Sequence, residues 1–79
     1  PALTEDRRKE LVKDVKKIAE NGKIALRNIR QDANSDMKKR KLPEDVEKSG
    51  NEDVQELINK YNKIIEEKLK EKEKELMTI

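Results

Sequence analysis

Basic side chains recur along the first half of the chain at a spacing that could bind phosphate. Helical geometry at 100° per residue brings seven polar side chains within about 40° of one line. These residues, here called the basic stripe, are Lys16, Lys23, Arg27, Arg30, Asn34, Lys38 and Lys41. Between Lys16 and Lys41, Glu20 is the only acid on the same line. A strip of cations can follow a phosphate backbone, and arginine suits bidentate phosphate contact.

A solvated helix surface is the competing interpretation of the basic stripe. Glu20 lies four residues after Lys16 and three before Lys23, a spacing that permits local ion pairs. Lysine-rich helix faces of this kind are common. The clustering of Arg27 and Arg30 favours phosphate contact, because lysine would serve solubility equally well. The pattern alone leaves both interpretations open.

The chain is poor in residues that catalyse reactions or bind metals. It contains no histidine and no cysteine, so the usual zinc ligands and the commonest general base are missing. Glu66, Glu67, Glu71, Glu73 and Glu75 alternate with lysines on a surface where nothing would raise their pKa for acid catalysis. We therefore expect no enzyme, no cofactor and no metal site.

Composition favours one small helical domain. Of the 79 residues, 48% are charged and 32% hydrophobic, with a single tyrosine as the only aromatic residue. The net charge is +2, but residues 1–41 carry 13 basic against 7 acidic side chains, and residues 42–79 carry 7 against 11. Apolar runs fall far short of the roughly 20 residues that span a bilayer.

Apolar periodicity predicts two long helices. The first should run from about Thr4, an N-cap, to about Arg40, and the second from Pro43 to about Leu76. Ser49, Gly50 and Asn51 could interrupt the second helix or provide a second N-cap. Because the connection is short, we predict an all-α, antiparallel helical hairpin.

Each predicted helix has an apolar stripe wider than one partner helix can cover. The residues expected to face inward are Leu11, Val15, Ile18, Leu26, Ile29, Val54, Leu57, Ile58, Tyr61, Ile64, Ile65 and Leu69. Tyr61 should keep its hydroxyl at the edge of this core, and Gly22 should permit close approach of the helices. The surplus apolar surface predicts two helices of a three-helix bundle, completed by a missing helix or a second copy.

Four segments of the chain resemble the C-terminal part of bacterial ribosome recycling factor. Residues 1–11 read Pro-x-Leu-Thr-Glu-x-Arg-Arg-Lys-x-Leu, and residues 25–34 contain the distinctive Arg-Asn-Ile-Arg-x-Asp-Ala-Asn block. Residues 52–55 read Glu-Asp-Val-Gln, and residues 72–77 read Lys-Glu-x-Glu-Leu-Met. The resemblance implies that residues 1–79 are a single helical domain, a partial three-helix domain I. The family's first helix and β-rich domain II are absent, with Pro1 at the hinge.

The resemblance also implies a function in the bacterial cytoplasm. Family members bind the large ribosomal subunit and its RNA after termination, and elongation factor G then helps to split the ribosome. Arg27 and Arg30 match the RNA-contacting positions, whereas Lys16, Lys23 and Lys38 are added by the stripe alone. Gln31, where many members carry an arginine, and a shorter linker at Leu42 and Pro43 depart from the family pattern. The alternative is a structural helical hairpin or coiled-coil module that does not bind RNA.

Overall fold

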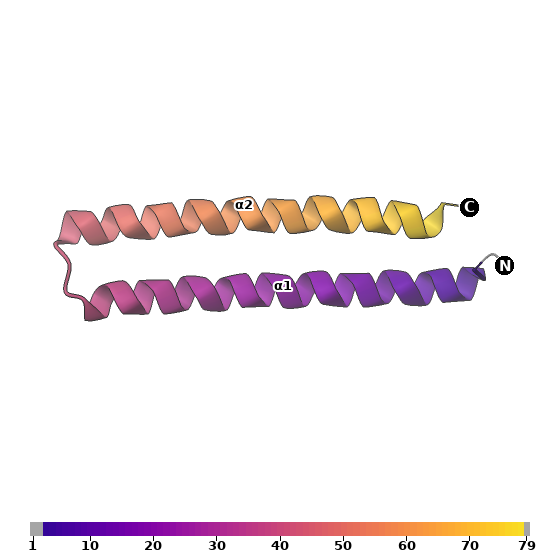
Figure 1. Cartoon of the computed structure of the whole chain (residues 1–79), viewed down its shortest axis with the longest axis horizontal. Coiled ribbons are helices and arrows are strands. Elements are labelled where there is room, and N and C mark those ends of the chain that lie inside the picture. The colour runs from indigo at the N-terminus through magenta and orange to yellow at the C-terminus, as the bar shows by residue number, and fades with distance from the viewer. Residues whose placement is uncertain (1–2, 79) are drawn as a thin grey trace.

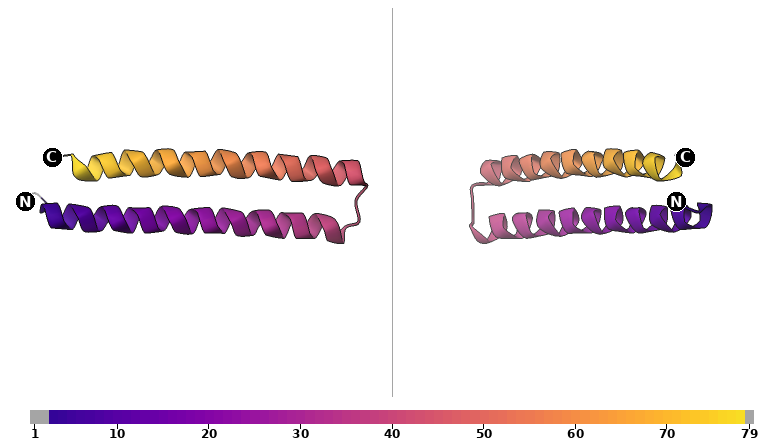
Figure 2. Two further views of the ribbon diagram at one scale, coloured as in Figure 1. Left: turned by 180° about the vertical axis from the view of Figure 1, so that it is seen from behind. Right: turned by 45° about the vertical axis from the view of Figure 1, so that its right-hand side comes forward.

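The computed structural model describes residues 3–78, which form two long helices. Helix α1 spans Glu5–Lys39 and helix α2 spans Glu44–Met77, joined by residues 40–43. The helices lie antiparallel along their whole length, so both ends of the chain lie at one end of the molecule (Figure 1; Figure 2 gives two further views). The described residues contain no strand, and the predicted all-α hairpin is confirmed. Pro1, assigned to the hinge, lies outside the described residues.

The sequence explains where α1 begins and ends. Thr4 is the N-cap, and its Oγ1 accepts a hydrogen bond of 3.1 Å from the backbone N–H of Arg7. Glu5 and Asp6 occupy the first turn and Lys38 and Lys39 the last, each where the helix dipole favours its charge. The predicted boundaries of this helix are therefore confirmed.

The connection between the helices is a tight turn. Lys41 has a φ of 52°, the left-handed conformation that commonly follows a helix end, although glycine is the usual residue there. Pro43 directly precedes α2, and its carbonyl accepts a 2.9 Å hydrogen bond from the Glu47 N–H. Proline suits this place because no backbone donor is needed at the start of a helix.

The predicted interruption at residues 49–51 is wrong, because α2 continues through them. Gly50 faces α1, where a Cβ atom would come within 2.6 Å of the Met37 Sδ atom. At Gly22 a Cβ would lie 3.3 Å from the Ile65 Cδ1 atom, which confirms that this glycine permits close approach. Both glycines thus accommodate the opposite helix.

The contact between α1 and α2, here called the seam, buries little. Ala19 and Ile58 are the only described hydrophobic residues to count as buried, with 9% and 7% of their surface exposed. The other correctly predicted seam residues are all half-buried: Leu11, Val15, Leu26, Val54, Ile65 and Leu69. Five residues predicted to face inward are exposed: Ile18, Ile29, Leu57, Tyr61 and Ile64. Two parallel cylinders touch along one line, so the rest of each apolar stripe stays uncovered.

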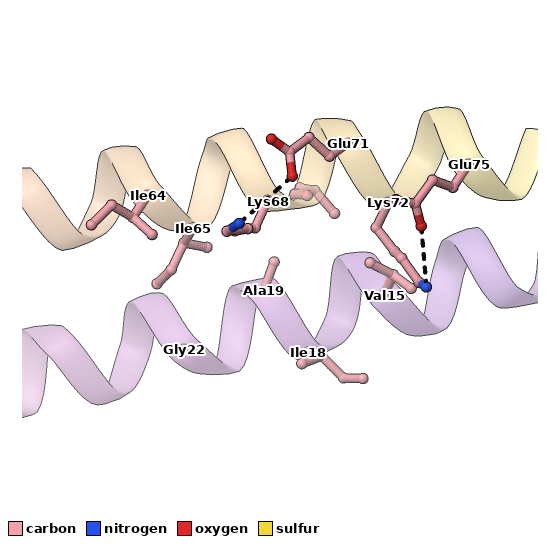
Figure 3. A pocket seen from close by; sticks show the side chains of 11 residues that line it. Val15, Ile18, Ala19, Gly22, Ile64, Ile65, Lys68, Glu71, Lys72 and Glu75 are labelled. Atoms are coloured by element: carbon pink, nitrogen blue, oxygen red, sulfur yellow. Dashed lines mark hydrogen bonds and ion pairs between the residues drawn. The ribbon is translucent and has the colours of Figure 1, made fainter.

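Two of the exposed apolar residues, Ile18 and Ile64, line a groove along one side of the seam. This apolar groove is lined by Val15, Ile18, Gly22, Ile64, Ile65 and Leu69. Lys68 and Lys72 stand at its edge and pair with Glu71 and Glu75 (Figure 3). In the same view Ala19 and Ile65 point toward the opposite helix, whereas Ile18 points away from α2. The expected surplus of apolar surface is therefore present.

Candidate functional site

The basic stripe borders the other side of the seam. Counting from Ala19 at 100° per residue, Lys23 lies about 40° to one side and Gly22 about 60° to the other. A second groove of about 570 Å³ runs there, here called the polar groove. It is lined by Lys23, Arg27 and Arg30 of α1 and by Gln55, Ile58, Asn62, Lys63 and Glu66 of α2.

Two lysines of the stripe meet carboxylates from α2. The Lys23 Nζ donates a hydrogen bond to Glu66 Oε1, and the Lys16 Nζ lies 3.8 Å from Glu73 Oε1. The hydrogen bond from Lys23 holds the pKa of Glu66 below its ordinary value, helped by attraction between the charges. The same bond raises the pKa of Lys23 above its ordinary value. Sequence reasoning found only Glu20 near the stripe, because acids on the second helix become neighbours only after folding.

Arg30 meets an amide instead of a carboxylate. Its Nη1 donates a 3.0 Å hydrogen bond to the Gln55 Oε1, and the Gln55 Nε2 donates a 2.8 Å bond to the Asn59 Oδ1. Arg30 is half-buried, whereas Arg27 of the same stripe is exposed. The reason is that α2 lies against this edge of the stripe. Gln55 and Asn59 carry no charge and gave no signal in the sequence.

Arg27 and Lys38 are exposed. Arg27 lines the polar groove, whereas Lys38 lies in the last turn of α1, beyond the residues that line it. Within residues 3–78, neither of them nor Arg30 forms an ion pair with a carboxylate. Lys41, the remaining cation of the stripe, forms no ion pair there either. The stripe is therefore divided into two paired lysines and four cations whose charges are not neutralised in this way.

Asparagines along the seam add hydrogen-bonding groups, and of these the sequence analysis had singled out only Asn34, as part of the basic stripe. The Oδ1 atoms of Asn34, Asn51 and Asn62 are buried and accept no hydrogen bond from the described residues. Asn62 lines the polar groove beside Arg27. For Asn51 and Asn62, the available signal was their position in register with the apolar residues of the second helix. Asn62 thus adds an acceptor to the groove that the cations line.

Other kinds of site find little support in the described residues. No group of three His, Cys, Asp or Glu side chains there is arranged to hold a metal ion. Neither α1 nor α2 contains an apolar stretch long enough to cross a membrane. Glu67, Glu71 and Glu75 form no ion pair with α1 and stand exposed on α2.

The fold and its two grooves define an all-α hairpin that presents a cationic surface on one side and an apolar surface on the other. The sequence profile described as "Ribosome recycling factor" matches residues 1–77. The chain belongs to the ribosome recycling factor family, which confirms the resemblance found in its sequence motifs.

Individual relatives support this assignment. The chain is 52% identical over 83 aligned residues to the ribosome-recycling factor of Bacillus subtilis (strain 168) and 49% identical to that of Staphylococcus carnosus (strain TM300). It is 53% identical over 79 residues to the factor of Acholeplasma laidlawii (strain PG-8A). Each comparison covers 100% of this chain but only 43% to 45% of the relative. The chain thus spans less than half the length of these relatives.

Proposed function

We propose that this chain is the ribosome-binding part of a translation factor that acts in ribosome recycling, and that its polar groove contacts RNA of the large subunit. One observation carries the proposal. Arg27 and Arg30 stand three residues apart in one groove, and neither is paired with a carboxylate in residues 3–78. Guanidinium groups in this state can bind phosphate oxygens bidentately.

Family membership supports the wider part of the proposal. The relatives carry the name ribosome-recycling factor, and the matching residues include the whole basic stripe. In the complete protein we expect the hairpin to bind after termination and elongation factor G to act with it in separating the subunits. The chain's own contribution is binding and positioning, with no bond made or broken by its side chains.

The geometry ranks the five cations proposed to bind RNA. Arg27 and Arg30 come first, and Lys38 follows because its charge is also not paired with a carboxylate within the described part of the chain. Lys23 and Lys16 come last, because Glu66 and Glu73 already compete for their ammonium groups. A phosphate would have to displace these carboxylates before it could use either lysine fully.

The apolar groove has a different proposed occupant, an amphipathic helix of the same protein. The relatives are more than twice as long as the segment that matches this chain, so they contain ample sequence for such a helix. Its apolar side would cover Ile18, Ile64 and their neighbours and complete a three-helix domain. A second copy of the hairpin is the competing occupant, and the two are distinguished by oligomeric state.

Binding of the complete protein to large ribosomal subunits tests the RNA-contacting role. Arg27→Ala and Arg30→Ala should each weaken binding by about 1–3 kcal/mol, as expected for loss of a charge-assisted contact. Each replacement should also reduce the slope of log affinity against log salt by about one, because one phosphate contact is lost. Lysine at either position should restore only part of the affinity.

Glu67→Ala is the matched control, since Glu67 is an exposed charged residue on α2 outside the polar groove. It should leave binding nearly unchanged. Unchanged affinity in the Arg27→Ala, Arg30→Ala double variant, or an equal loss in Glu67→Ala, would favour the alternative of a structural hairpin without RNA binding. In that case binding should also depend little on salt.

A further inference from the structure

We propose that Gln55 is a positioning residue that holds the Arg30 guanidinium at the polar groove without neutralising its charge. The inference rests on the proposed function of Arg30 as an anion-binding side chain and adds a role for a neutral residue on the opposite helix. It comes from the hydrogen bonds that link Arg30, Gln55 and Asn59 across the seam.

The hydrogen-bond chain determines the orientation of the Gln55 amide. Its Oε1 accepts from Arg30 Nη1 at 3.0 Å, while its Nε2 donates to Asn59 Oδ1 at 2.8 Å. Rotation of the amide by 180° would bring its NH₂ group against the guanidinium, which has only donors, and its oxygen against the Asn59 oxygen. Asn59, one helical turn after Gln55, therefore keeps the acceptor of Gln55 directed at Arg30.

The arrangement leaves most of the guanidinium available. A guanidinium has five N–H donors, and the bond to Gln55 uses one of them. Arg30 and Gln55 are both half-buried, which restricts the rotamers of a long side chain. A side chain already restrained in the free protein loses less conformational entropy when it binds. Arg30 is thus held in place with four donors left for an anion.

The neighbouring contacts show why an amide matters. Where the stripe presents Lys23 and Lys16, α2 presents the carboxylates of Glu66 and Glu73. Where the stripe presents Arg30, α2 presents an amide. A carboxylate at this place would also orient the guanidinium, but it would compete with phosphate for its charge. The second helix therefore neutralises two lysines and supports the arginine.

Two replacements of Gln55 separate orientation from charge. Large-subunit binding by the complete protein is measured at several salt concentrations. Gln55→Glu keeps an acceptor but adds a competing charge, so affinity should fall by about tenfold, and the slope of log affinity against log salt should decrease by about one. Gln55→Leu removes the acceptor but keeps a side chain of similar size. Affinity should fall several-fold with the salt slope unchanged, because the charge of Arg30 remains.

Gln31→Leu is the matched control, because it makes the same chemical change at an exposed glutamine of α1 that does not line the polar groove. It should bind as the unaltered protein does. In an Arg30→Ala background, Gln55→Leu should cause no further loss. The positioning role is overturned if Gln55→Leu binds large subunits as tightly as Gln31→Leu does. It is also overturned if Gln55→Leu lowers the affinity as much in the Arg30→Ala background as in the unaltered protein.

A spectroscopic measurement keeps this inference separate from the RNA-binding proposal. In ¹⁵N NMR spectra of the free protein, the Arg30 guanidinium should rotate and exchange slowly. Gln55→Leu should accelerate both processes, whereas Gln55→Glu should not. Equal mobility with and without Gln55 overturns the positioning role. If Arg30→Ala leaves subunit binding unchanged while this mobility change occurs, the proposed RNA contact fails and the orientation by Gln55 stands.

Discussion

Lys23 and Arg30 lie seven residues apart on the same face of α1, but their charges meet different partners. Lys23 donates to a carboxylate of Glu66, and Arg30 donates to the amide of Gln55. An ammonium paired with a carboxylate has little attraction left for phosphate, whereas an arginine bonded to an amide retains its full charge. The value of a cation for binding anions therefore depends on the residue opposite to it.

The Lys23–Glu66 pair predicts how stability depends on pH. The lowered pKa of Glu66 means that its contribution is present above the ordinary value of 4.5 and is lost as pH falls through the lower folded value. The raised pKa of Lys23 means that its contribution is present below 10.5 and is lost as pH rises through the higher folded value. Thermal unfolding should show Glu66→Gln melting at a lower temperature than the unaltered chain at pH 7.

Acid should remove this difference, and a nearby carboxyl provides the control. At pH 3, below the ordinary pKa of 4.5, unfolding is accompanied by proton uptake at Glu66, so the pair contributes less stability and the two melting temperatures should lie closer together. Glu67→Gln makes the same change at an exposed residue that forms no ion pair within residues 3–78, so its effect should vary less with pH. A gap between Glu66→Gln and the unaltered chain that is the same at pH 3 and pH 7 would contradict the interpretation.

At the scale of the elements, the first turns of α1 hold the end of α2. The Arg8 Nη1 donates hydrogen bonds of 2.8 Å to the backbone carbonyls of Leu76 and Thr78. Carbonyls in the last turn of a helix have no partner within the helix, and a cation there also interacts favourably with the helix dipole. Arg8 thus acts as a C-terminal cap supplied by the other helix.

Arg8→Ala should loosen the last turn of α2. We expect a loss of unfolding free energy on the order of 1–2 kcal/mol, because two hydrogen bonds from a charged group disappear and the contact is only partly buried. Hydrogen exchange should become faster at the Thr78 amide, which bonds to the Lys74 carbonyl at 3.0 Å. Urea unfolding and amide exchange would measure the two effects.

Lys9→Ala serves as the comparison for Arg8. Lys9 pairs with Glu5 at 3.5 Å within α1, and both side chains are largely exposed, so its removal should cost well under 1 kcal/mol. It should also leave exchange at the end of α2 unchanged. Equal effects of the two replacements would show that Arg8 acts only through the local stability of α1.

At the scale of the whole molecule, the hairpin is extended and incompletely covered. Its dimensions are 61 × 16 × 12 Å, and its radius of gyration is 18.1 Å. A globular domain of this length would have a radius of gyration of about 12 Å. Ile18, Ile29 and Leu57 each leave more than half of their surface exposed, at 69%, 57% and 54%. The seam alone therefore gives the chain little hydrophobic stabilisation.

The isolated chain should for this reason not behave as a well-packed monomer. At micromolar concentration we expect association in sedimentation experiments, or broad and weakly cooperative thermal unfolding, because the apolar groove remains open to water. Ile18→Lys should reduce association by placing a charge in the groove. A sharply unfolding, stable monomer would contradict this prediction.

Ile24→Lys is the control for that experiment. Ile24 is another exposed isoleucine of α1, with 43% of its surface accessible, but it does not line the apolar groove. The same substitution there should leave association unchanged. If Ile18→Lys and Ile24→Lys reduce association equally, net charge and not the groove controls it.

Much of the fold could be predicted from the sequence because its determinants are local. The helix boundaries are specified by contacts within a few residues. For α1 these involve Thr4 as N-cap, the acidic first turn and the basic last turn, and for α2 the preceding Pro43. The periodicity of the apolar residues also indicated that the apolar stripe of each helix is wider than one partner helix can cover. The interruption expected at Gly50 failed because packing against Met37 gives this glycine a different role.

The state of each candidate site residue depended on tertiary structure. The sequence by itself determined which cations share one face of α1, since helical geometry repeats from residue to residue. Only the packing of α2 decided that Lys23 meets Glu66, that Arg30 meets Gln55, and that Ile18 and Tyr61 remain exposed. Partners 43 and 25 residues apart along the chain become neighbours only when the hairpin closes, and the register of that closure is determined by both helices together.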